Sequence, residues 1–150
     1  MRGQLCTDMC GNHYIKGWAR TQNHVILSSA GAELIALVKC TTEMLGVRAM
    51  MRDWGWLKAG IIYADSSSAL AIAKRRGAGK LRHIHISALW IQEKQDREEA
   101  VYAKVLGTEN PADLMTKHLV REKVDKYLAV MSQCRKDGRA ESGLELQGAK

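Results

Sequence analysis

Hydrophobic and polar positions follow two periods along this chain, and the changes of period predict strands and helices in alternation. Some segments alternate, or are short apolar runs with strand-forming residues, while others have apolar residues at helical spacing. The predicted strands are residues 13–19, 60–64 and 100–106. The predicted helices are residues 30–53, 66–76, 84–98 and 120–131. Another helix is predicted to start with Asn110 as its N-cap and Pro111 at its first position. This order is typical of an α/β fold.

The two ends of the chain lack such patterns. Residues 1–12 are polar, contain glycine and have no clear period, which predicts a poorly structured N-terminal segment. Residues 13–131 hold all the predicted elements and form one domain, in keeping with a length of 150 residues. Residues 132–150 are charged and rich in glycine, which predicts a flexible tail.

Charge adds a candidate binding surface. The formal net charge is +7 and the sequence pI is about 9.4, which favours a polyanionic partner such as nucleic acid. The densest basic cluster follows the strand at residues 60–64. Its candidate backbone-contacting residues are Lys74, Arg75, Arg76, Lys80 and Arg82.

The sequence favours an intracellular protein, cytoplasmic or nuclear. It has no apolar run long enough to span a membrane, and its first residues lack the apolar stretch of a signal peptide. We therefore expect no membrane partner. Four scattered cysteines in such a chain are expected to be reduced thiols.

Three acids occupy comparable places in the predicted elements. Glu33 and Asp113 lie in the first turns of predicted helices, where an acid favours the helix dipole. Asp65 ends a predicted strand, where it could cap the helix that follows, as could the serines at positions 66–68. Metal-dependent phosphoryl chemistry offers another explanation, because two Mg²⁺ ions about 3.5–4 Å apart need clustered carboxylates. The sequence leaves both explanations open for each acid.

Around these acids the chain resembles the ribonuclease H domain at the C-terminal end of the Pol polyprotein of Ty1/copia-type retrotransposons. The resemblance covers residues 13–131, and its matching segments are short but occur in the expected order. They are WARTQ (18–22), SSAGAELIAL (28–37), ADSSSA (64–69), RHIHI (82–86) and NPADLMTK (110–117).

This resemblance implies a ribonuclease H-like mixed sheet with flanking helices. It implies hydrolysis of the RNA strand of an RNA–DNA hybrid during reverse transcription, beside the reverse transcriptase portion of the same polyprotein. Glu33, Asp65 and Asp113 match three metal-binding and catalytic acids of the family, which hold two Mg²⁺ ions, with Mn²⁺ as an alternative.

The chain also departs from the family. The family's first acid stands on a first strand, followed by a second and a third, and residues 13–19 match the third. We therefore expect the first two strands to be absent, as in an N-terminally truncated domain. Asp8 is the nearby substitute for the first acid, but only Met-Cys-Gly-Asn separates it from His13.

Two functions follow from this comparison. The chain is a metal-dependent ribonuclease H, impaired by loss of the first acidic strand, or it is a non-catalytic remnant with at most weak nucleic-acid binding. The sequence favours little activity in the isolated chain. A basic adaptor domain unrelated to nucleases is a third explanation.

Overall fold

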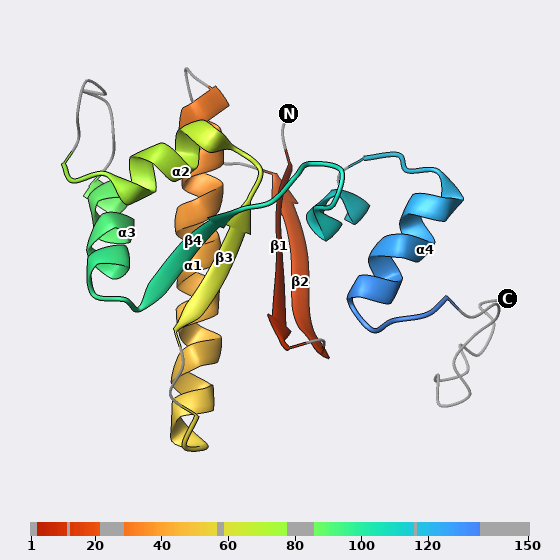
Figure 1. Ribbon diagram of the computed structural model, residues 1–150, viewed down its shortest axis with the longest axis horizontal. Coiled ribbons are helices and arrows are strands. Elements are labelled where there is room, and N and C mark those ends of the chain that lie inside the picture. Colours follow the sequence, from red (N-terminus) through yellow and green to blue (C-terminus); the bar gives the residue numbers. More distant parts are fainter. Residues whose placement is uncertain are drawn as a thin grey trace, which may run out of the picture.

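The protein is a mixed α/β fold with a small parallel sheet, a separate hairpin and flanking helices, as seen in a computed structural model (Figure 1). The structure describes residues 3–11, 13–21, 29–56, 59–77, 86–115 and 117–135. Its strands are β1 (Gly3–Cys10), β2 (His13–Thr21), β3 (Gly60–Ala64) and β4 (Ala100–Lys104). Its helices are α1 (Ser29–Asp53), α2 (Ser67–Lys74), α3 (Ile86–Asp96), the 3₁₀ helix η1 (Pro111–Met115) and α4 (Arg121–Val130).

The parallel sheet consists of β3 and β4, whose register runs from Gly60 opposite Ala100 to Ala64 opposite Lys104. A parallel pair needs a crossover connection, and α2 and α3 supply it. This arrangement confirms the predicted mixed α/β class and is compatible with a ribonuclease H-like fold.

The prediction for residues 1–12 was wrong at the level of local structure. The strand β1 pairs antiparallel with β2, and Cys10 lies opposite His13. Only two residues therefore join the strands, and Gly11 adopts a φ of +59°. Two-residue hairpin turns need such left-handed residues, which glycine adopts without strain. The tight turn leaves room for a strand directly before His13, contrary to the expectation from the short spacing between Asp8 and His13.

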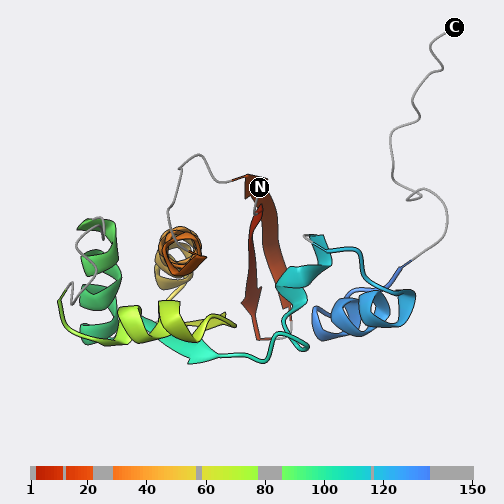
Figure 2. The ribbon, with the colours of Figure 1, turned by 90° about the horizontal axis from the view of Figure 1, so that it is seen from above.

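The core lies between the parallel sheet and α1, α2 and α3 (Figure 2). Apolar side chains from every one of these elements meet there. Its buried members are Leu34, Leu37, Ile62, Leu70, Ile72, Ala73, Ile91, Ala100 and Tyr102. The apolar stripe predicted for residues 30–53 is thus the buried face of α1.

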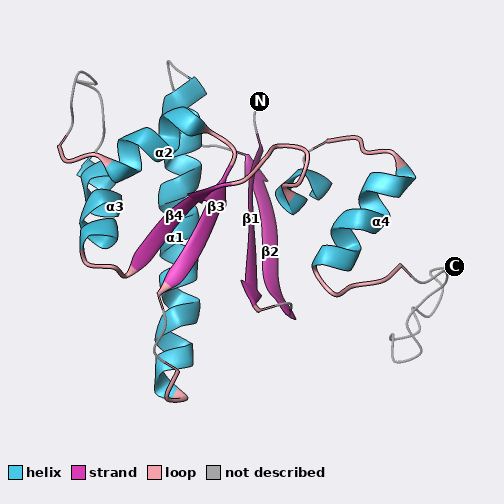
Figure 3. Cartoon of the chain, in the orientation of Figure 1, coloured by secondary structure: helices cyan, strands magenta, loops and turns pink. Residues whose placement is uncertain are grey.

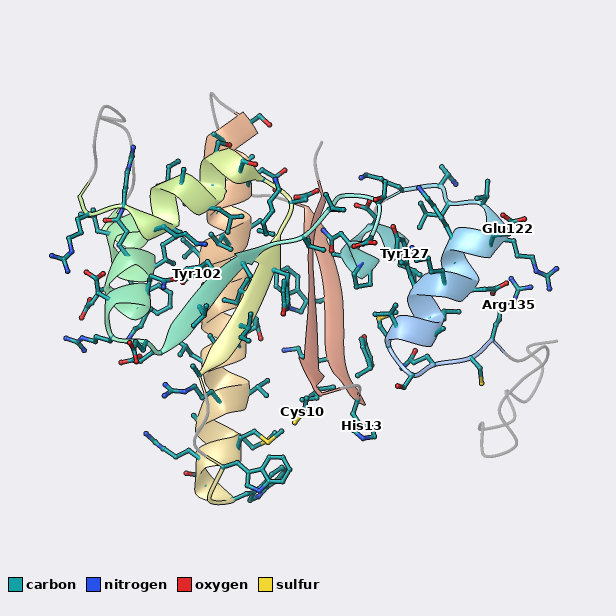
Figure 4. The ribbon with its side chains drawn as sticks, in the orientation of Figure 1. Cys10, His13, Tyr102, Glu122, Tyr127 and Arg135 are labelled. Atoms are coloured by element: carbon teal, nitrogen blue, oxygen red, sulfur yellow. The ribbon has the colours of Figure 1, made fainter. Side chains whose placement is uncertain are left out.

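Two hydrogen-bonded groups organise this core. Tyr102 points from β4 toward α1 (Figure 4), where its hydroxyl lies 3.0 Å from Thr41 Oγ1. The buried amide of Gln92 on α3 donates to the carbonyls of Ile72 (2.8 Å) and Gly77 (3.1 Å), and accepts from the Gly77 N–H (2.9 Å). These bonds hold α1 to β4 and α3 to the end of α2.

The cysteines differ from the expectation of reduced thiols. Cys10 and Cys134 are free, as expected, whereas Cys40 on α1 is disulfide-bonded. Within the described residues, the helices are too short or too polar to cross a membrane.

Candidate functional site

The candidate site lies at the carboxyl end of the parallel sheet, where β3 and β4 end and the chain continues toward η1 (Figure 3). In open α/β sheets, ligands bind at this end of the strands. Asp65 follows β3 directly, and Asp113 lies in the first turn of η1.

Asp65 is not the helix cap that one interpretation predicted. Ser66 is the N-cap of α2, and its hydroxyl accepts a hydrogen bond from the Ala69 N–H at 3.3 Å. Asp65 is exposed, so its carboxylate is available to solvent. This finding removes the simplest structural explanation for an acid at this position.

Asp113 is placed by the local sequence as predicted. Asn110 Oδ1 accepts a hydrogen bond from the Ala112 N–H at 3.1 Å, and Pro111 opens the helix, although the helix is 3₁₀. The Asp113 side chain is only 14% exposed, and it pairs with Lys117 Nζ at 2.7 Å. Its position in the first turn leaves the dipole explanation open beside the ligand explanation.

Two lysines that sequence reasoning missed lie among these acids. The bond to Asp113 raises the pKa of Lys117, and the charge of Asp65 adds to the increase. Lys104 at the end of β4 donates to the backbone carbonyl of Asp65 and to Ser67 Oγ (2.6 Å). The spacing of four residues between Asp113 and Lys117 was a usable signal, whereas Lys104 reaches its partners only through the sheet.

Glu33 lies on the half-buried side of α1 near its start. The helix begins at Ser29 and has no acid in its first turn, so Glu33 stands just beyond the turn in which it was predicted. The dipole interaction falls off within that turn, which weakens the simple electrostatic explanation.

The described residues do not complete a metal site. No group of three His, Cys, Asp or Glu side chains among them is close enough to hold an ion. The structure thus places Asp65 and Asp113 within electrostatic range of one lysine, but does not gather Glu33 with them into a ligand set. The side chain of Asp8, on β1, lies outside what the structure describes.

The basic cluster is described only in part. Lys74 and Arg76 are exposed at the end of α2, and Arg75 is half-buried. Arg76 Nε lies 3.5 Å from Asp96 on α3, although its side chain remains 89% exposed. Lys80 and Arg82 lie outside the described residues.

Comparison with known proteins supports an origin in a copia-type retrotransposon Pol polyprotein. The chain is 32% identical over 109 residues to the retrovirus-related Pol polyprotein from transposon TNT 1-94 of Nicotiana tabacum. The match takes in 71% of the chain, which spans 8% of that polyprotein. No protein-family model and no solved structure matches the chain.

Proposed function

We propose that this chain is the ribonuclease H-like part of a copia-type Pol polyprotein, and that by itself it cleaves little RNA. The observation that carries the proposal is the placement of Asp65 and Asp113. Segments far apart in sequence bring both acids to the carboxyl end of the parallel sheet, where both act on Lys117. The related Pol polyprotein supports the same origin.

The expected low activity follows from the acids. Phosphodiester hydrolysis with Mg²⁺ or Mn²⁺ requires carboxylates that converge on the ions. We retain Glu33, Asp65 and Asp113 as the proposed catalytic and metal-binding residues. Because the described residues form no group of three such ligands, we assign no catalytic step to a metal in this chain.

The proposed substrate is an RNA–DNA hybrid, contacted through its phosphates. Lys74 and Arg76 present exposed charge on the end of α2, and the net charge of +7 favours a polyanion. Arg75 is a further proposed contact, and Lys80 and Arg82, which lie outside the described residues, are proposed from the sequence alone. Contacts of this kind set affinity and orientation rather than base specificity.

A cleavage assay tests the nuclease proposal. The chain, its Asp65→Asn variant and an Asp125→Asn control are incubated with a labelled RNA–DNA hybrid and Mg²⁺. Asp125 is an exposed acid on α4, so its variant matches the charge change away from the site. We expect little cleavage by any of the three. Robust cleavage that Asp65→Asn abolishes and Asp125→Asn retains would overturn the proposed inactivity and establish the nuclease.

A binding titration tests the nucleic-acid contact. Fluorescence anisotropy with the same hybrid should show affinity that falls steeply as salt rises from about 50 to about 200 mM. Each phosphate contact removed by Lys74→Gln or Arg76→Gln should lower the slope of log K against log salt by about 0.9, whereas Lys126→Gln on α4 should not. Affinity independent of salt contradicts the proposed contact.

The alternative is a non-catalytic remnant of the same polyprotein. It is favoured by the ion pair of Asp113 with Lys117, because the lysine neutralises an acid that a metal would otherwise use. A remnant gives no cleavage in any polyprotein context. A ribonuclease H-like part gives cleavage once the missing portion of the polyprotein is joined to it.

A further inference from the structure

The last part of α1 projects from the rest of the molecule. Figures 1 and 3 show this helix continuing past the start of β3, at the end of the sheet away from the candidate acids. Every residue of α1 is described, and its buried residues all lie between Ala32 and Thr41. The part of the helix after Thr41 contains no buried residue, so burial in the core does not account for how far the helix extends.

The projecting helix ends in a hydrogen-bonded turn. The Trp56 N–H donates to the Met51 carbonyl at 3.0 Å. The Gly55 N–H donates to the Arg52 carbonyl at 2.9 Å. Gly55 has a φ of +82°, which completes the Schellman motif of a helix C-terminus. These bonds fix the backbone on both sides of Gly55, so Trp54 and Trp56 are held in place at the end of the helix.

The apolar side chains at this turn are exposed. Trp54 is 66% exposed and Trp56 is 61% exposed. Met50, one helical turn before Trp54, is 41% exposed. We call Met50, Trp54 and Trp56, together with Arg52, the α1 tip. An indole is among the largest apolar groups in a protein, so two exposed indoles on one turn indicate a binding surface rather than a part of the core.

The charges around the indoles favour an anionic partner. Arg52 is exposed in the last turn of α1, and Arg48 is half-buried one turn earlier, against one exposed acid, Asp53. Single-stranded nucleic acid combines phosphates with unpaired bases, and its bases stack on exposed aromatic rings while cations contact its backbone. A duplex keeps its bases paired and stacked, so along its length it offers the indoles no such surface.

We propose that the α1 tip binds single-stranded nucleic acid by stacking bases on Trp54 and Trp56 and by contact of Arg52 with phosphate. The helical rise per residue places Trp54 about 30 Å from Glu33 along α1. The α1 tip is therefore separate from the candidate acids. The proposal goes beyond hybrid cleavage and does not depend on it.

Fluorescence anisotropy with a labelled oligothymidylate of about 16 nucleotides tests the stacking. Trp54→Ala and Trp56→Ala should each weaken binding about tenfold, and the double variant about a hundredfold, because each removes the surface for one stacked base. Trp54→Tyr keeps an aromatic face, so it should weaken binding no more than about threefold. Tyr63→Ala is the matched control, since Tyr63 is an aromatic residue outside the α1 tip that is 62% exposed, and it should leave the affinity unchanged.

The salt dependence of the same titration tests the charge contact. Arg52→Gln should lower the slope of log K against log salt by about 0.7, the value for one phosphate contact with a single strand. Arg52→Lys should restore the slope, and Lys126→Gln on α4 should not change it. The double tryptophan variant should bind a blunt-ended RNA–DNA hybrid as the native chain does, so failure here is distinguishable from failure of the proposed hybrid contact.

Four results would overturn the proposal. The first is failure of the native chain to bind the oligothymidylate, and the second is equal affinity of the native chain and the double tryptophan variant. The third is a loss of affinity in Tyr63→Ala as large as that in Trp54→Ala. The fourth is a double variant that keeps oligothymidylate binding but loses binding to anionic vesicles or to a second copy of the chain, which would identify a different partner.

Discussion

The hydroxyl pair between α1 and β4 allows a sharp prediction about stability. Thr41 and Tyr102 are 0% and 1% exposed. The Thr41 hydroxyl donates its single hydrogen to the Leu37 carbonyl at 2.8 Å, so it can only accept from Tyr102. The two partners are therefore not equivalent, because one is the donor of their shared bond and the other the acceptor.

Removing the acceptor should cost more than removing the donor. Thr41→Val leaves the Tyr102 hydroxyl buried without an acceptor, a penalty of about 1–3 kcal/mol in the free energy of unfolding. Tyr102→Phe removes the hydroxyl itself and leaves Thr41 bonded to Leu37, so it should cost about 0.5–1.5 kcal/mol. The double variant should cost less than the sum of the two, because the unpaired donor is gone.

Urea unfolding followed by circular dichroism measures these differences. Tyr63→Phe is the matched control, since Tyr63 is 62% exposed and should change stability little. Two results would refute the assignment of donor and acceptor. One is a Thr41→Val variant that is as stable as Tyr102→Phe. The other is a double variant whose loss in the free energy of unfolding equals the sum of the two single losses.

The dependence of stability on pH provides a second test of the Tyr102 hydroxyl. Burial raises the pKa of Tyr102 above its ordinary value of 10.0. The stability that depends on the neutral phenol is present below about pH 10 and is lost as the pH rises through the raised pKa. Tyr102→Phe should therefore reduce the loss of stability in alkali. An unchanged alkaline profile contradicts this account.

Three further predictions follow from other contacts. Gln92→Met should cost about 1–3 kcal/mol in urea unfolding and speed exchange of the Gly77 amide, whose acceptor it removes; unchanged exchange contradicts the contact. A hydrogen bond from Lys16, which has the largest effect, and another from Lys39 lower the pKa of Glu43 from 4.5 to about 2. Glu43→Gln should remove the stability that is present above pH 4.5 and lost as the pH falls through about 2, so an unaltered acid-unfolding profile would argue against the pair. Tyr127→Phe should cost about 1 kcal/mol, because its hydroxyl donates to a loop carbonyl at 3.0 Å (Figure 4), and no cost would mean that water replaces this bond.

Local signals predicted the elements that position the candidate acids. The apolar run at residues 60–64 became β3, and the serines after Asp65 supplied the cap of α2. Asn110 and Pro111 started a helix at the expected residue. These features depend on backbone preferences and on bonds between near neighbours, which a sequence displays directly.

Other predictions failed because distant contacts decided them. The strand β1 has no clear period, and it forms because the tight turn at Gly11 lets it pair with β2. Lys104 reaches the carbonyl of Asp65 because parallel pairing sets the ends of β3 and β4 side by side. No spacing in the sequence predicts this contact between Lys104 and the Asp65 carbonyl.

The sequence by itself determined the α/β order, the basic charge and the three candidate acids with their places near element ends. Only the tertiary structure decided that Lys104 reaches the carbonyl of Asp65, and that Glu33 does not join Asp65 and Asp113 in a ligand set among the described residues. It alone showed that the described strands form two two-stranded sheets, and that both sheets contact α1. The reason is physical, since local sequence sets the conformation of each segment, whereas pairing and packing between segments set which side chains and edges meet.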